Sequence, residues 1–172
     1  MGWSDPLLDD WAVDEEVTAA KMDRAVKDNL SWLGSVRPHC QVRDATGPTG
    51  TASWVNPSWD AITTNVGSMA ASSTGFVTAS TAGFYLIGAS CTFGSDGTAG
   101  VRALMLSSAA NGGGTVYCQS NVPLHSGSAS GAVASTMIQM GASTSVYAAT
   151  FVPTGFAGGV TNIRMWAIWM TT

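Results

Sequence analysis

The stretch that decides the fold is Phe84–Phe93, which reads FYLIGASCTF. Apolar side chains occupy every second position, and small or polar ones fall between them. The apolar set is Tyr85, Ile87, Ala89, Cys91 and Phe93, and the set between them includes Gly88, Ser90 and Thr92. A period of two predicts a strand with one face in a core and the other toward solvent.

Clusters of Gly, Pro, Asn and Ser divide the chain after residue 44 into further short runs. They fall at residues 47–50, 56–58, 94–97, 111–114, 126–131 and 158–159. The runs between them are rich in Val, Ile, Thr and aromatic residues, which favour strands. About eight to ten such runs separated by turns predict a mainly β protein, an antiparallel β-sandwich or jelly roll.

Two late strands are apolar on both faces. In 144–152, Val146, Ala148 and Val152 oppose Tyr147, Ala149 and Phe151; in 163–170, Ile163, Met165, Ala167 and Trp169 oppose Arg164, Trp166, Ile168 and Met170. One face of each strand must therefore be covered by something outside its own core. A second copy of the chain is the simplest cover. We expect a homotrimer with Tyr147, Phe151, Trp166 and Ile168 as interface candidates, although the pattern leaves open which face is the outer one.

Charge is concentrated near the N-terminus. Residues 1–44 hold nine acidic and five basic side chains, whereas the other 128 residues hold only Asp60, Asp96, Arg102 and Arg164. Ordinary domains are about one quarter charged, and charge keeps free monomers in solution. The composition therefore favours a subunit of a larger assembly. A pI near 4.8 argues against a nucleic-acid partner, and the lack of a long apolar run argues against a membrane span.

The first 37 residues are expected to form an arm, separate from a head domain over 38–172. After Thr18, a candidate N-cap, apolar residues recur at helical spacing and predict one helix over about 18–33, ended by Gly34. Its apolar stripe consists of Met22, Val26, Leu30 and Leu33. The stripe either packs on the chain's own domain or docks on another protein, and the acidic, turn-rich leader before it favours docking.

No motif in the sequence predicts catalysis, a cofactor or a metal. Three cysteines without C-x-x-C spacing argue against a disulfide framework and a thiolate zinc site. His39 beside Cys40 is a conceivable nucleophile pair, but nucleophile and base seldom adjoin in sequence, so a structural interpretation is favoured. We expect a protein that is not an enzyme.

Trp54 and Trp59 flank Asn56-Pro57 and are candidates for stacking on sugar rings. The alternative is that both tryptophans plug the end of the sandwich, and this core interpretation is favoured.

The stretch Trp59–Gly88 resembles the globular heads of complement first-component and tumour-necrosis-factor-like proteins. The family pattern falls on Asn65, Thr74, Gly75, Phe76, Gly83 and Tyr85. Later counterparts are Gly100-Val101-Arg102, Met137–Gly141 and the closing strand Ile163–Met170. The resemblance covers roughly residues 38–170 and implies a tumour-necrosis-factor-like jelly roll that assembles as a homotrimer.

Residues 17–33 are similar to the start of many small bacteriophage virion proteins, typically tail-associated ones, in which a short helix precedes a head of this kind. This resemblance implies a virion component assembled in the bacterial cytoplasm, with the arm docked on other virion proteins. The first expectation is a minor tail or fibre-associated protein whose head contacts host-surface polysaccharide. The alternatives are a capsid decoration protein and, from another class, a free carbohydrate-binding module.

Overall fold

The computed structural model describes residues 37–47, 52–71, 74–123 and 128–171. The chain divides into two units, Met1–Arg37 and Pro38–Thr172, and the second is described here. The expected helix over 18–33, with Met22, Val26, Leu30 and Leu33, lies outside the described residues.

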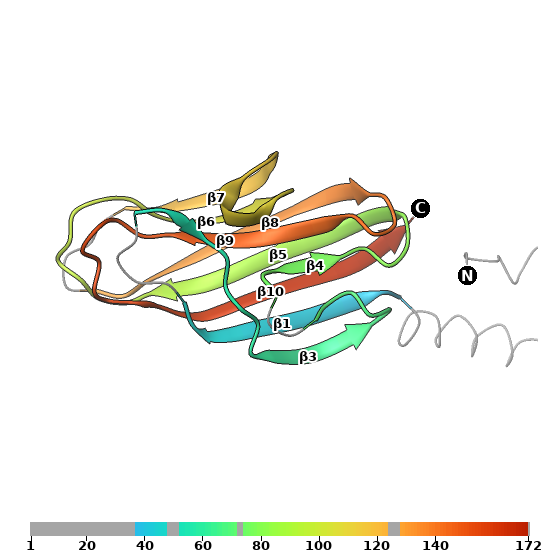
Figure 1. Ribbon diagram of the computed structural model, residues 1–172, viewed down its shortest axis with the longest axis horizontal. Coiled ribbons are helices and arrows are strands. Elements are labelled where there is room, and N and C mark those ends of the chain that lie inside the picture. The colour runs from blue at the N-terminus through green and yellow to red at the C-terminus, as the bar shows by residue number, and fades with distance from the viewer. Residues whose placement is uncertain (1–36, 48–51, 72–73, 124–127, 172) are drawn as a thin grey trace, which may run out of the picture. The chain divides into compact units, whose positions relative to one another are not determined.

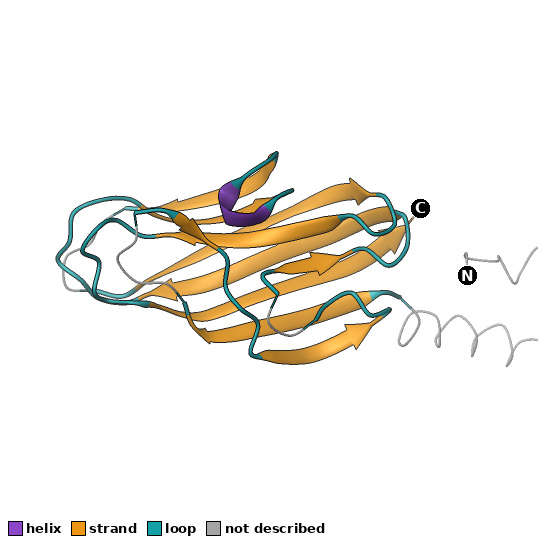
Figure 2. Cartoon of the chain, viewed as in Figure 1, coloured by secondary structure: helices purple, strands orange, loops and turns teal. Residues whose placement is uncertain are grey.

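The second unit is built from antiparallel strands (Figures 1 and 2). In chain order the elements are β1 (His39–Thr46), β2 (Trp54–Val55), β3 (Ala61–Val66), β4 (Phe76–Thr78), β5 (Gly83–Phe93), β6 (Arg102–Ser107), the short 3-10 helix η2 (Ala110–Gly112), β7 (Val116–Val122), β8 (Ser130–Met140), β9 (Ser145–Phe151) and β10 (Val160–Thr171).

The strands form two packed sheets. The first sheet has the order β3-β1-β10-β5-β8, and the second has the order β2-β9-β6-β7, with β4 also paired to β9. From β4 to β10 the chain passes repeatedly from one sheet to the other, so strands far apart in sequence become neighbours. The prediction of a mainly β antiparallel sandwich is confirmed.

The core lies between the sheets and follows the period-two pattern. On β5, Tyr85, Ile87 and Phe93 are fully buried. On β10, the buried set is Ile163, Met165, Ala167 and Trp169. The set that contains Trp166 and Ile168 therefore faces away from the core. This is the outer face of β10, which the sequence pattern alone did not identify.

His39 and Cys40 occupy opposite faces of β1. His39 pairs with Ile168 on the outer face, whereas Cys40 pairs with Ala167 and is buried. Successive residues of a strand point to opposite sides, so the two side chains cannot form a nucleophile–base pair. Burial also raises the pKa of the Cys40 thiol to about 12, which keeps it protonated.

Among the described residues, no helix has the length and apolar character needed to cross a membrane.

Candidate assembly surface

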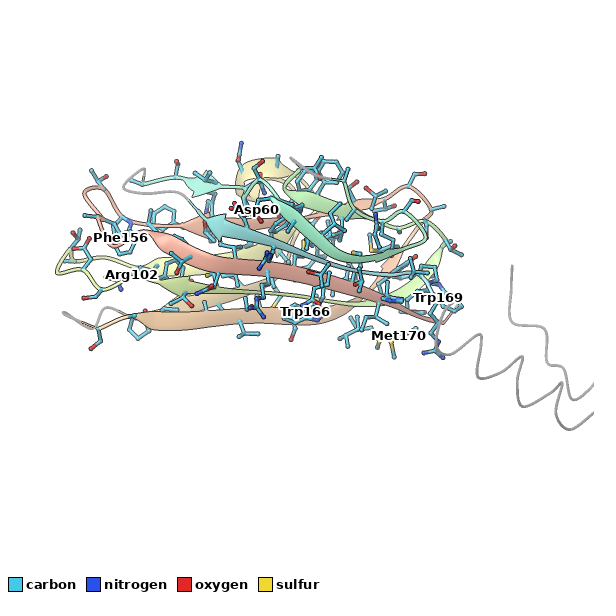
Figure 3. The ribbon with its side chains drawn as sticks, turned by 90° about the horizontal axis from the view of Figure 1, so that it is seen from below. Asp60, Arg102, Phe156, Trp166, Trp169 and Met170 are labelled. Carbon is cyan, nitrogen blue, oxygen red and sulfur yellow. The ribbon has the colours of Figure 1, made fainter. Side chains whose placement is uncertain are left out.

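The outer face of the first sheet carries a group of exposed apolar side chains. Strand register places Ile168 of β10 beside Leu86 of β5, and Leu86 beside Met137 of β8. Met137 is 61% exposed, Leu86 39%, and Ile168 and Met170 each 37%. We call Leu86, Met137, Trp166, Ile168 and Met170 the outer apolar patch. Figure 3 shows Trp166 and Met170 on the side of β10 that faces away from the second sheet.

Trp166 lies flat across Gly88 in the neighbouring strand. The two residues are direct partners in the β10–β5 register. A Cβ atom on Gly88 would lie 2.1 Å from Cζ2 of Trp166, closer than van der Waals contact permits. The missing side chain at Gly88 therefore lets the indole ring lie against the sheet, where it forms a broad, low apolar surface.

The other two interface candidates lie on a different sheet. Tyr147 and Phe151 project from the outer face of the second sheet, and each contacts an aromatic ring of the same chain. The centroids of the Tyr147 and Phe76 rings are 5.0 Å apart, and those of Phe151 and Trp54 are 5.5 Å apart. The structure thus separates Tyr147 and Phe151 from Trp166 and Ile168, and each of the first pair has an aromatic neighbour on the adjacent strand of its own sheet.

The two tryptophans proposed for sugar stacking are used in packing. Trp59 is only 1% exposed, and its indole nitrogen donates a hydrogen bond to the carbonyl oxygen of Phe76. Trp54 packs against Phe151 and against Gly112 of η2. Trp59 is therefore part of the core, and it leaves no ring face open to a sugar.

The loops at the end of the sandwich opposite the C-terminus are tied together by Asp96. Its Oδ1 accepts hydrogen bonds from the amide and hydroxyl of Thr98, both at 2.8 Å. Its Oδ2 accepts from the amides of Ala157 and Gly158. These hydrogen bonds stabilise the ionised carboxylate over the protonated acid and so lower the pKa of Asp96 to about 2. The loop after β5 is thereby fixed to the loop before β10.

Arg102 fills the core beneath these loops. It is fully buried, its guanidinium lies 4.7 Å from the centroid of Phe156, and its Nη2 donates to the carbonyl oxygen of Asp96. Figure 3 places Arg102 and Phe156 together at this end. The arrangement supports the loops from within through a cation–π contact and a hydrogen bond.

The described residues contain no cluster of three or more His, Cys, Asp or Glu side chains that could hold a metal ion. The Cys91 thiol, buried like that of Cys40, has its pKa raised to about 12 by burial.

Two residues of the outer apolar patch, Leu86 and Met137, were not expected from the sequence. Met170 was expected on the same face as Trp166 and Ile168 but was not among the interface candidates. Leu86 lies between Tyr85 and Ile87, so it belongs to the outward-facing set of the strand with Gly88, Ser90 and Thr92. The sequence therefore did indicate an apolar residue on the outer face of this strand.

No protein-family model matches the sequence, and no curated protein matches it. The structure is similar to murine APRIL crystallised at pH 5.0, with a TM-score of 0.61 and 8% identity over 78% of this chain and 99% of that one. It is also similar to the globular domain of zebrafish complement 1qA protein, with a TM-score of 0.55 and 12% identity over 78% of this chain and 97% of that one. These similarities confirm the tumour-necrosis-factor-like jelly roll.

Proposed function

We propose that this chain is a non-enzymatic virion structural protein whose β domain assembles as a homotrimer through the outer apolar patch. The observation that carries the proposal is the patch itself, in which Trp166 and exposed apolar side chains from three adjacent strands lie on one face of the first sheet. Contiguous exposed apolar surface of this kind is typical of protein interfaces. The similarity to complement and tumour-necrosis-factor-like heads supports self-association.

The virion part of the proposal rests on the resemblance of residues 17–33 to bacteriophage tail-associated proteins. In this proposal the first 37 residues attach the trimer to the particle and the head is displayed outward. A minor tail or fibre-associated protein is the first candidate. Capsid decoration is the second candidate.

A free carbohydrate-binding module has less support. Trp59 was one of its two candidate contacts, and it is buried in the core. Trp54 packs on Phe151 within the same chain.

The test is the mass of the assembled protein. Ile168→Glu places a charge in the outer apolar patch, and we expect it to convert a trimer to monomers, measured by light scattering at micromolar concentration. Val116→Glu is the matched control, because Val116 is an exposed apolar residue on β7 of the second sheet. The control should remain trimeric.

The same two variants test the role in the virion. Copies per virus particle should fall for Ile168→Glu and stay near normal for Val116→Glu. A monomeric parent chain would refute the trimer, and equal incorporation of a monomeric Ile168→Glu variant would refute the need for assembly.

A further inference from the structure

A surface hollow of about 300 Å³ lies beside the outer apolar patch. It is lined by Gln41, Arg43, Thr63 and Arg164, which come from β1, β3 and β10. The outer apolar patch lies on β10, β5 and β8, so the two features share only β10. The four lining residues come from one chain, and Gln41 is the register partner of Trp166 in the outer apolar patch.

Two of the lining residues are arginines that lie side by side on adjacent strands. Arg43 of β1 and Arg164 of β10 are direct partners in the strand register, and both are exposed. Like charges placed directly opposite on one face destabilise a sheet. Within the described part of the chain, neither side chain has an ion pair or a hydrogen bond to relieve this repulsion.

The pair is conspicuous because the domain contains so little charge. Residues 38–172 hold only three arginines and three aspartates and no lysine or glutamate. The third arginine, Arg102, supports the loops from within the core. Asp96 is occupied by its four hydrogen bonds, and Asp44 is buried and accepts a hydrogen bond from the amide of Ser58. Two of the three arginines are thus gathered in one place, and the third aspartate, Asp60, donates its backbone amide to the carbonyl oxygen of Arg43.

A β-bulge shapes the wall of the hollow. The register between β1 and β3 passes from Gln41–Thr64 to Val42–Ile62, so Thr63 is left without a partner on β1. A bulge of this kind re-aims a side chain and is common beside functional sites. Here it brings the Thr63 hydroxyl to the same hollow as the two guanidinium groups and the Gln41 amide.

We propose that this hollow binds an oxyanion group, a phosphate or a carboxylate carried by a small molecule or a sugar. Guanidinium forks bind both groups through paired, charge-assisted hydrogen bonds. An anion between Arg43 and Arg164 would turn their repulsion into attraction, while Gln41 and Thr63 supply neutral donors. A volume of about 300 Å³ is at the small end for ligand sites, which fits a sugar acid or a sugar phosphate better than a bare ion.

The experiment measures thermal stability of the full chain in inorganic phosphate, in glucuronate and in chloride at matched ionic strength. Phosphate or glucuronate at about tenfold excess over its Kd should raise the melting temperature by about 3–6 °C relative to chloride. A larger shift with glucuronate identifies a carboxylate-bearing sugar, and a larger shift with phosphate identifies a phosphate-bearing ligand.

Three variants make the result specific. Arg43→Gln and Arg164→Gln should abolish the shift, and in chloride they should melt at or above the parent temperature because the repulsion is gone. The control is Asn121→Asp on β7, which changes the net charge by the same amount and keeps an acceptor for Gln119. It should keep the full shift. Equal melting of the parent in all three salts, or an undiminished shift in both arginine variants, would overturn the proposal.

Discussion

At the scale of single residues, the outer face depends on the contact between Trp166 and Gly88. Trp166 is large enough to dominate the surface of β10, yet it lies flat because its partner has no side chain. Gly88 carries no positive φ, so an alanine there would meet no backbone strain. The stability lost when a methyl group is added at Gly88 is therefore the free energy needed to displace the indole ring of Trp166.

Gly88→Ala is expected to destabilise the fold by about 1–3 kcal/mol, the range for overpacking at a filled site. Urea denaturation of the full chain measures this cost. Gly131→Ala on β8 is the control, since the nearest atom to its new Cβ would be 3.8 Å away. In a Trp166→Ala background most of the cost should disappear; if it persists there, the steric origin is wrong.

At the scale of elements, Asp96 joins two loops that belong to different parts of the sequence. The amides of Ala157 and Gly158, on the loop before β10, share a carboxylate with Thr98 on the loop after β5. The pKa of Asp96 is lowered from 3.8 to about 2 in the fold. A depressed pKa means that the carboxylate stabilises the fold above about pH 4 and that this contribution is lost as the pH falls through about 2.

Asp96→Asn should therefore melt below the parent at pH 7, because an amide nitrogen would face the amides that now donate to Oδ2. The difference should shrink between about pH 4 and pH 2, where the parent carboxyl becomes protonated. Melting curves across this range check the prediction. A difference that stays constant down to pH 2 would mean that shape, and not charge, ties the loops.

The elements also show what the sequence could predict. The alternation in β5, together with the recurring turn clusters, was strong enough to give the fold class and the core face of β5. Both faces of β9 are apolar, and its outer aromatic rings lie beside Phe76 and Trp54 of the adjacent strands, with η2 close to Trp54. An apolar period shows that a strand face avoids water, but it does not show which element lies against that face. A short strand such as β2 and a 3-10 turn have no periodic pattern of their own that could be found in the sequence.

The hollow at Arg43 and Arg164 was beyond sequence reasoning for a similar reason. The two arginines are 121 residues apart and meet only through the β1–β10 register. The bulge that brings in Thr63 is a shift of one position between neighbouring strands. Neither the pairing of distant strands nor a single register shift can be read from spacing along one chain.

At the scale of the whole molecule, the boundary between the two units follows the contacts of β1. Pro38 is the first residue of the second unit, and its carbonyl oxygen accepts a hydrogen bond from the amide of Trp169 at 2.8 Å. From His39 onward, β1 lies between β10 and β3 and pairs with both. A chain shortened to Pro38 keeps all of these pairings, whereas one shortened further loses part of a central strand.

We therefore expect the fragment Pro38–Thr172 to fold alone, with a β-type circular dichroism spectrum and a melting temperature within a few degrees of the full chain. The fragment Arg43–Thr172 lacks the buried Cys40 and Val42 and leaves part of β10 as an unpaired edge. Burial of a side chain such as Val42 is worth about 1.5–3 kcal/mol, and whole domains are stable by only about 5–15 kcal/mol. Together with the lost strand pairing, this deficit should remove the cooperative thermal transition of the shorter fragment. If Pro38–Thr172 also failed to fold, the first 37 residues would be part of the folding unit and not a separable arm.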